Sequence, residues 1–170
     1  MQRAGRSLRR AFEDGSNTQA REDMSIASLF SGLALANAGL GAVHGFASPL
    51  GGQTTAPHGV ICGKLLPLVM ETNVHALQQR APDSPALPRF DEVARILTGR
   101  DTARASDAVT WLQELCSGFA LPSLSRYGLA REDVPAVVAQ ARKASSMNGN
   151  PIELRDDELV TVLEEAMARP

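Results

Sequence analysis

The decisive stretch of this chain reads Gly41-Ala-Val-His44-Gly-Phe-Ala-Ser48-Pro-Leu-Gly51-Gly52-Gln-Thr-Thr-Ala-Pro57-His58-Gly59. It holds two of the three histidines, and no Asp, Glu, Lys or Arg occurs between Ser25 and Gly63. An uncharged segment is expected to be buried, and a buried imidazole costs free energy unless its ring nitrogens have partners. A divalent metal ion would serve both rings, since neutral imidazole is its commonest protein ligand. The segment therefore suggests a metal ion shared by His44 and His58, although on spacing alone two core histidines bonded to backbone carbonyls are the favoured interpretation.

Composition and charge narrow the class of protein. A chain of 170 residues is long enough for one domain, and 44% hydrophobic with 21% charged residues is typical of a soluble globular protein. The net charge of -2 gives no reason to expect nucleic acid or a membrane as a partner. Cys62 and Cys116 are too few and too far apart for a zinc motif or a disulfide framework, and they indicate reduced, buried thiols in a cytoplasmic protein. Cys62 shares a helix face with His58, so a thiolate ligand is a lesser alternative.

One apolar stretch, Ile26 to Val43, is long enough to cross a bilayer, and we identify no other of that length. Ser28, Ser31 and Asn37 interrupt it, and no aromatic anchors flank it. We therefore expect a buried helix at the centre of a bundle, and a membrane-embedded helix is the alternative.

The remaining pattern predicts a single all-helical domain over residues 1–170. Ser16 and Gln19 have the spacing of a capping box at the start of the second helix. The helical turn after Gly41 is expected to end at Pro49-Leu-Gly51-Gly52, where paired glycines would let a phosphate or nicotinamide approach the backbone. Helices are predicted at about residues 2–14, 16–40, 57–79, 90–97, 106–119, 131–144 and 155–168.

Three other polar features carry weaker expectations. Ser48 lies four residues after His44 and so faces the same way on a helix, but it has no adjacent base for nucleophilic catalysis. His75 is expected at the surface. Glu22 and Asp23 open a helix, where carboxylates complement the helix dipole, although one of them could support an imidazole instead.

The quoted stretch and its flanks closely resemble the iron-containing (group III) alcohol dehydrogenases. The resemblance is carried by a His-Gly-x-Ala element and a Pro-His-Gly element with a glycine pair between them, and by the flanking Ala20-Arg-Glu-Asp-Met24 and Leu65-Leu66-Pro67. It is strongest over residues 18–80 and continues more loosely to Gly149-Asn-Pro151 and the final helix.

The resemblance implies the C-terminal helical bundle of a dehydroquinate synthase-like fold, with the metal-site segment at about residues 37–67. It implies that His44 and His58 bind Fe2+ or Zn2+, which polarises an alcohol or carbonyl oxygen while hydride passes to or from NAD(P). Many members carry a further histidine at the position of Ser48. The hydroxyl found there is expected to contact nicotinamide or to relay a proton only as part of a chain.

No residue of this sequence matches the family's nucleotide-binding domain or the Asp and His ligands that precede it. We therefore expect a helical domain that is inactive alone and that associates with the missing half or with itself. The alternatives are a non-catalytic interaction module or pseudo-enzyme that binds no metal, and a metal-independent member of the family. The substrate is expected to be a small alcohol or aldehyde; the sequence does not choose between NAD and NADP, or between metals.

Overall fold

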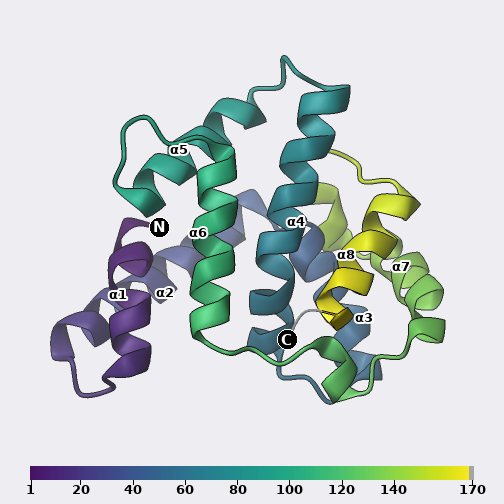
Figure 1. The fold of residues 1–170 in the computed structure, drawn as a ribbon, viewed down its shortest axis with the longest axis horizontal. Helices are drawn as coiled ribbons and strands as arrows, with labels where there is room; N and C mark the ends of the chain where they lie inside the picture. The colour runs from purple at the N-terminus through teal and green to yellow at the C-terminus, as the bar shows by residue number, and fades with distance from the viewer. Residues whose placement is uncertain (169–170) are drawn as a thin grey trace.

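The computed structural model describes residues 1–168, and every regular element within them is a helix (Figure 1). This confirms the predicted all-helical fold. The elements are α1 (Gln2–Glu13), α2 (Thr18–Ala38), α3 (Ala42–Gln53), α4 (His58–Arg80), α5 (Ala86–Thr98), α6 (Ala105–Gly118), η1 (Leu124–Tyr127), η2 (Arg131–Asp133), α7 (Val134–Lys143), η3 (Ser145–Gly149) and α8 (Asp156–Ala168).

The central helix is α4, which contacts α3, α5, α6 and α8 (Figure 1). Apolar side chains are distributed around it, so it can be covered on several sides at once. Leu65 and Val69 belong to the larger of two apolar clusters, and Met70 belongs to a smaller one shared with α5 and α6. The helix therefore joins the two parts of the core. Leu66, in contrast, is exposed.

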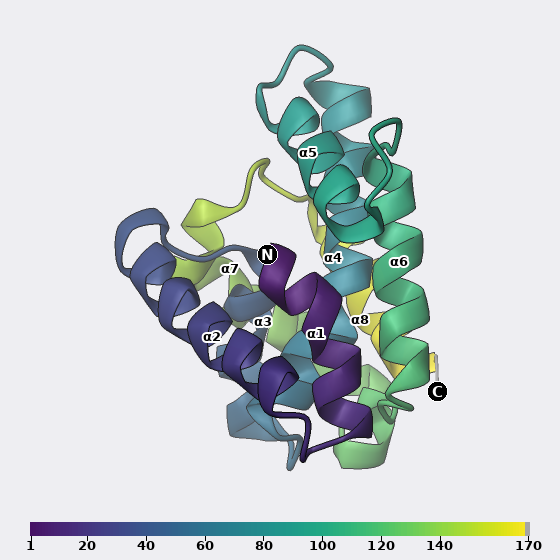
Figure 2. The ribbon, with the colours of Figure 1, turned by 90° about the vertical axis from the view of Figure 1, so that its left-hand side faces the viewer.

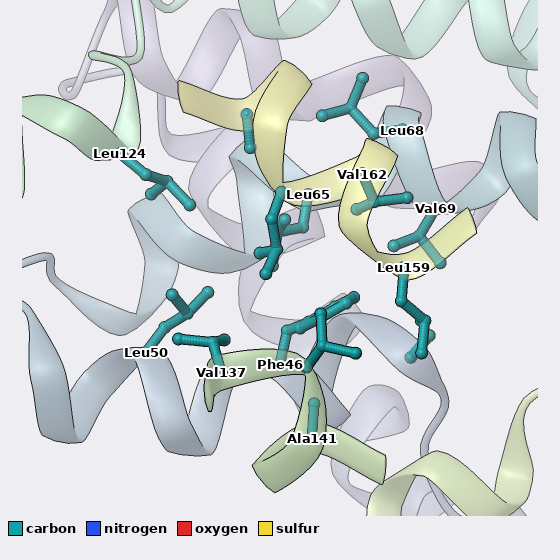
Figure 3. Packing of buried hydrophobic residues seen from close by; sticks show 14 of the residues in the cluster. Phe46, Leu50, Leu65, Leu68, Val69, Leu124, Val137, Ala141, Leu159 and Val162 are labelled. Atoms are coloured by element: carbon teal, nitrogen blue, oxygen red, sulfur yellow. The ribbon is translucent and has the colours of Figure 1, made fainter. Parts of the chain in front are cut away.

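The larger cluster unites side chains of α3, α4, α7 and α8, with α3 in contact with α4 and α7, and α8 in contact with α4 and α7 (Figure 3). Phe46 and Leu50 of α3 are fully buried, and so are Leu65 of α4, Val137 of α7 and Leu159 of α8. Burial of each large apolar side chain stabilises the fold by about 1.5–3 kcal/mol. This packing fixes how the beginnings of α3 and α4 lie relative to each other.

The prediction that the helical turn after Gly41 ends at Pro49 was wrong, because α3 continues to Gln53. A proline within a helix costs about 3 kcal/mol through its lost hydrogen bond and its ring clash. Burial of Phe46 and Leu50 on either side of it is large enough to offset that cost. The glycine pair at 51–52 consequently lies in helical backbone and forms no loop for a phosphate or nicotinamide.

The prediction of a buried central helix at residues 26–43 was also wrong. The chain bends by 101° between α2 and α3, and residues 28–39 are all exposed. Leu29, Phe30 and Leu33 are 64%, 61% and 54% exposed. Figure 2 shows α2 beside α1 at the edge of the molecule. An apolar composition predicts that a helix needs cover, but it does not say which element supplies it.

A helix other than residues 26–43 is long and apolar enough to cross a bilayer. By length and composition α4 could span a bilayer, but 61% of its most apolar window is buried within the protein, as in a core helix. The α2 and α3 helices meet the same criterion only as a pair with the 101° bend between them.

The start of α2 is capped by Asn17, whose side chain accepts a hydrogen bond from the amide of Ala20 at 3.0 Å. Ser16 instead donates its hydroxyl to Asp14 at 2.6 Å. The predicted capping box of Ser16 and Gln19 was therefore wrong, because the N-cap is Asn17 and the third helical residue, Ala20, has no side chain that could complete a box. Asn is as effective a cap as Ser, so residue type alone does not favour Ser16 over its neighbour Asn17.

Asp23 joins α1 to α2 and does not act through the helix dipole. Its carboxylate is fully buried and accepts hydrogen bonds from Arg6 Nε and Nη2, from Arg3 Nη1 and from the Ser7 hydroxyl at 2.6–2.7 Å. The Arg6 and Ser7 hydrogen bonds, followed by that of Arg3, hold the pKa of Asp23 far below its usual range. Such charge-assisted, bidentate bonding gives the contact a defined geometry.

Replacing Asp23 with Asn should lower the midpoint of thermal unfolding at pH 7 by several degrees, because Ser7 and the two arginines lose an anionic acceptor. The folded carboxyl has the lower pKa, so as the pH falls below about 4 the unfolded chain takes up the proton first. Wild-type stability therefore decreases there, and the difference between wild type and Asp23→Asn narrows.

Thermal unfolding followed by circular dichroism at pH 7 and pH 3 measures both effects. The exposed neighbour Glu22 supplies the control Glu22→Gln, which should unfold like the wild type. An unchanged difference between wild type and Asp23→Asn at the two pH values would contradict the assignment.

Candidate metal centre

The structure brings His44 and His58 together, although they lie on different helices. His44 is in the first turn of α3, and His58 is the first residue of α4. Their ring centroids are 5.5 Å apart, and the ring planes are inclined by 50°. His44 is half-buried, whereas His58 is exposed, contrary to the expectation that both imidazoles are buried. The pair therefore lies at the surface of the helical domain, accessible to a ligand.

Cys62 is the third member of this cluster. Its sulfur lies 3.4 Å from His58 Nε2 and 3.9 Å from His44 Nε2. One ligand atom from each residue falls within 4.8 Å of the other two. The favoured sequence interpretation, an inert buried thiol, described its half-buried position but not its neighbours. The signal was the four-residue spacing from His58, which placed the two side chains on one helix face.

The electrostatics of the cluster suit a cation. Burial lowers the pKa of His44, and the charge of the nearby His58 lowers it further. His44 is therefore neutral at pH 7 and can offer a lone pair. Burial raises the pKa of the Cys62 thiol, so the thiol keeps its proton unless a cation displaces it.

The donor set and its spacing fit a divalent transition metal. Bond lengths of about 2.0–2.1 Å to nitrogen and about 2.3 Å to sulfur, at tetrahedral angles, separate the two donor atoms by roughly 3.6 Å. The two measured separations between the Cys62 sulfur and the imidazole nitrogens, 3.4 and 3.9 Å, lie on either side of this value. Two imidazoles and one thiol are also ligands that zinc and related metals accept.

The beginning of α3 is held by an asparagine 108 positions away in the sequence. Gly41 provides no capping side chain, and the amide of Ala42 donates to Asn150 Oδ1 at 3.1 Å. Asn150 also exchanges hydrogen bonds with the buried Asn73 of α4 at 2.6 and 3.2 Å. Gly149 allows this approach, since a Cβ there would lie 1.9 Å from the Leu40 carbonyl oxygen.

This amide pair is a positioning feature of the site that no residue pattern predicted. Asn73 and Asn150 connect the first turn of α3, which carries His44, to the middle of α4. The only available signal was the Gly149-Asn-Pro151 turn, and nothing in the sequence linked it to Asn73. Side-chain amides of this kind fix an orientation because both groups donate and accept at once.

Ser48 does not join the cluster. It is exposed and lines a shallow hollow with Pro49 and Gly52 of its own helix and with Gln140 and Lys143 of α7. Within residues 1–168, no hydrogen bond connects its hydroxyl to either imidazole. His75 is exposed on α4, as predicted.

Comparison with known proteins matches nearly all of this chain to one protein family. Residues 1–167 match the C-terminal part of the Fe-containing alcohol dehydrogenase family. The 1,3-propanediol dehydrogenase of Klebsiella pneumoniae is 34% identical over 163 residues, and alcohol dehydrogenase 4 of Saccharomyces cerevisiae is 30% identical over 161. These matches cover 95% and 94% of this chain but 41% and 40% of those proteins.

Solved structures agree with the sequence comparison. The structure of 1,3-propanediol oxidoreductase matches with a TM-score of 0.85 at 32% identity, and covers 97% of this chain and 42% of its own. An alcohol dehydrogenase from Oenococcus oeni matches with a TM-score of 0.81 at 34% identity over the same shares of the two chains. The chain thus spans about two fifths of the length of the proteins it matches.

Replacing Asn150 with Ala should destabilise the protein by about 1–3 kcal/mol, because it leaves the buried Asn73 amide without its partner. It also removes the acceptor for the Ala42 amide, so His44 should become less ordered. Urea denaturation measures the first effect, and the line widths of the His44 ring signals in NMR report the second. The exposed neighbour gives the control Asn148→Ala, and equal stability of the two variants would refute the positioning role of Asn150.

Proposed function

Because the chain belongs to the Fe-containing alcohol dehydrogenase family and corresponds to the C-terminal part of its members, we propose that it is the helical metal-binding half of an NAD(P)-dependent oxidoreductase. The whole protein would interconvert small alcohols and aldehydes. The observation that carries the proposal is the meeting of His44 and His58 at the first turns of α3 and α4. Related proteins named as alcohol and 1,3-propanediol dehydrogenases support the reaction class.

His44 and His58 would hold the metal, Fe2+ or Zn2+, through their Nε2 atoms. When bound, the metal supplies a Lewis acid for the oxygen of the alcohol or aldehyde. His44 contributes a neutral ring whose helix is anchored by Asn150. His58 contributes a ring that is open to solvent and therefore to substrate. A contact between Ser48 and nicotinamide, or a proton relay through it, stays a prediction.

The exposed apolar half of α2 supports a proposal about the partner. Residues 28–39 are exposed on all sides of the helix, and Leu29, Phe30 and Leu33 are more than half exposed. An apolar helix of this length is normally covered by another surface. The matched relatives are more than twice as long as this chain. We therefore propose that a nucleotide-binding α/β half covers α2, whether it is joined to this chain or separate.

We also infer a cytoplasmic protein that contacts neither nucleic acid nor a membrane. Both cysteines are free in the structure, as expected for a reducing compartment. The net charge of -2 provides no electrostatic attraction to an anionic surface.

Purified chain should bind about one Zn2+ or Fe2+ per molecule, because two imidazoles and a thiol present converging donors. Replacing His44 or His58 with Ala should weaken binding by roughly 100-fold or more, a larger effect than the loss of an outer-shell partner. Metal titration under anaerobic conditions, with elemental analysis of the stoichiometry, measures both.

His75 provides the matched control, since it is a solvent-exposed histidine of α4 outside the cluster. His75→Ala should bind metal like the wild type. A chain that takes up no metal under any condition would instead be a non-catalytic helical module or pseudo-enzyme.

Residues 1–170 alone should produce no reduced nicotinamide from a small alcohol and NAD(P)+, because residues 1–168 form helices and contain no α/β nucleotide-binding unit. They should also self-associate through α2, and replacing Leu29, Phe30 and Leu33 with Gln should reduce that association without loss of helix. Absorbance of the reduced cofactor, sedimentation velocity and circular dichroism test these points.

A gain of turnover and loss of self-association on adding the nucleotide-binding half of a relative would support the proposed partner. Stable, specific dimers that persist in the triple variant would show that the chain does not self-associate through α2. Turnover by residues 1–170 alone would contradict the division of labour between the two halves.

A further inference from the structure

We propose that Cys62 is the third protein ligand of the metal centre and that its thiolate makes the site prefer Zn2+ to Fe2+. This inference rests on the proposed binding of a divalent metal by His44 and His58, and it concerns which atoms surround the metal and which metal they favour.

The position of the Cys62 sulfur supports its role as a ligand. Cys62 lies one helical turn after His58, so both side chains project from the same face at the beginning of α4. The sulfur is close to Nε2 of both rings, at 3.4 and 3.9 Å, although the rings come from different helices. Two rings that point the same nitrogen at one sulfur mark a common centre between the three atoms.

A hydrogen bond is a weaker account of the same geometry. Sulfur is a poor hydrogen-bond donor and acceptor, and the longer of the two contacts lies near the limit for such a bond. His58 is exposed and could be hydrated by water, so it gains little from a thiol. A cation at the centre of the cluster uses all three donor atoms at once, and residues 1–170 then leave one position of a tetrahedral shell open.

The chemistry of the donors sets the choice of metal. On binding, the S–H bond of Cys62 breaks, a metal–sulfur bond forms, and the proton passes to solvent. Thiolate is a soft ligand, and at such a site Zn2+ binds more tightly than Fe2+ in the usual order of divalent metals. Two neutral imidazoles and one thiolate would leave the bound metal a net charge of +1.

Cobalt substitution tests the ligand directly, because Co2+ bound to a thiolate shows a sulfur-to-metal charge-transfer band in the near ultraviolet. Residues 1–170 loaded with Co2+ should show this band together with the visible bands of a tetrahedral ion. Cys62→Ser should lose the charge-transfer band, keep cobalt on the two histidines, and show at least a tenfold smaller preference for Zn2+ over Fe2+. The matched control Cys116→Ser should keep the band, because Cys116 donates to the carbonyl of Gly63 and lies outside the cluster.

A second measurement needs no variant and so does not depend on how Cys62→Ser folds. Zn2+ should protect Cys62, but not Cys116, from alkylation in the wild-type chain, as read by peptide mass spectrometry. Visible cobalt bands without the charge-transfer band, or equal alkylation of Cys62 with and without Zn2+, would overturn the role of Cys62 while leaving the histidine site intact. Failure of Co2+ and Zn2+ to bind at all would overturn the proposed function, and this inference with it.

Discussion

The packing of α3 against α4 is the constraint on which the candidate site depends. Phe46 and Leu50 on α3 are buried in the same apolar cluster as Leu65 of α4 and side chains of α7 and α8. Their burial offsets the cost of Pro49 within α3 and keeps that helix intact. Because the helix axes are fixed in this way, the first turns of α3 and α4 present His44 and His58 at one surface. The packing of the core therefore also sets the distance and orientation of the two imidazoles.

A second set of contacts refines that arrangement. The Asn73–Asn150 pair attaches the first turn of α3 to α4, and Gly149 permits the close approach that this requires. Directional bonds between amides specify an orientation that apolar packing alone leaves free. The site thus combines a non-directional force, which brings the helices together, with directional bonds that set the position of His44.

The N-terminal hairpin of α1 and α2 is held mainly by polar contacts, in contrast to the apolar packing of α3 against α4. Asp23 joins the two helices through a buried, bidentate contact with Arg6, while the second half of α2 remains uncovered. A strong polar contact orders the hairpin without requiring a large apolar core beneath α2. The second half of α2 therefore keeps an exposed apolar surface.

Much of this architecture could be predicted from residue patterns, because helical periodicity, helix ends and the spacing of His44 and His58 are local properties. The helical class followed from them, the family followed from the resemblance of the His-Gly-x-Ala and Pro-His-Gly elements, and both are confirmed. Three predictions were wrong because each rested on a local pattern. The apolar run in α2 predicted a buried helix, Pro49 predicted a helix end, and Asp23 predicted a contact with the helix dipole. In each case contacts with distant residues decided the structure. Which residues of separate helices meet depends on packing between segments far apart in the chain. The sequence alone therefore determined the helices and the two imidazoles, whereas only the tertiary structure decided that Cys62 lies beside both of them and that Asn150 holds α3, because these contacts exist only once the core has closed.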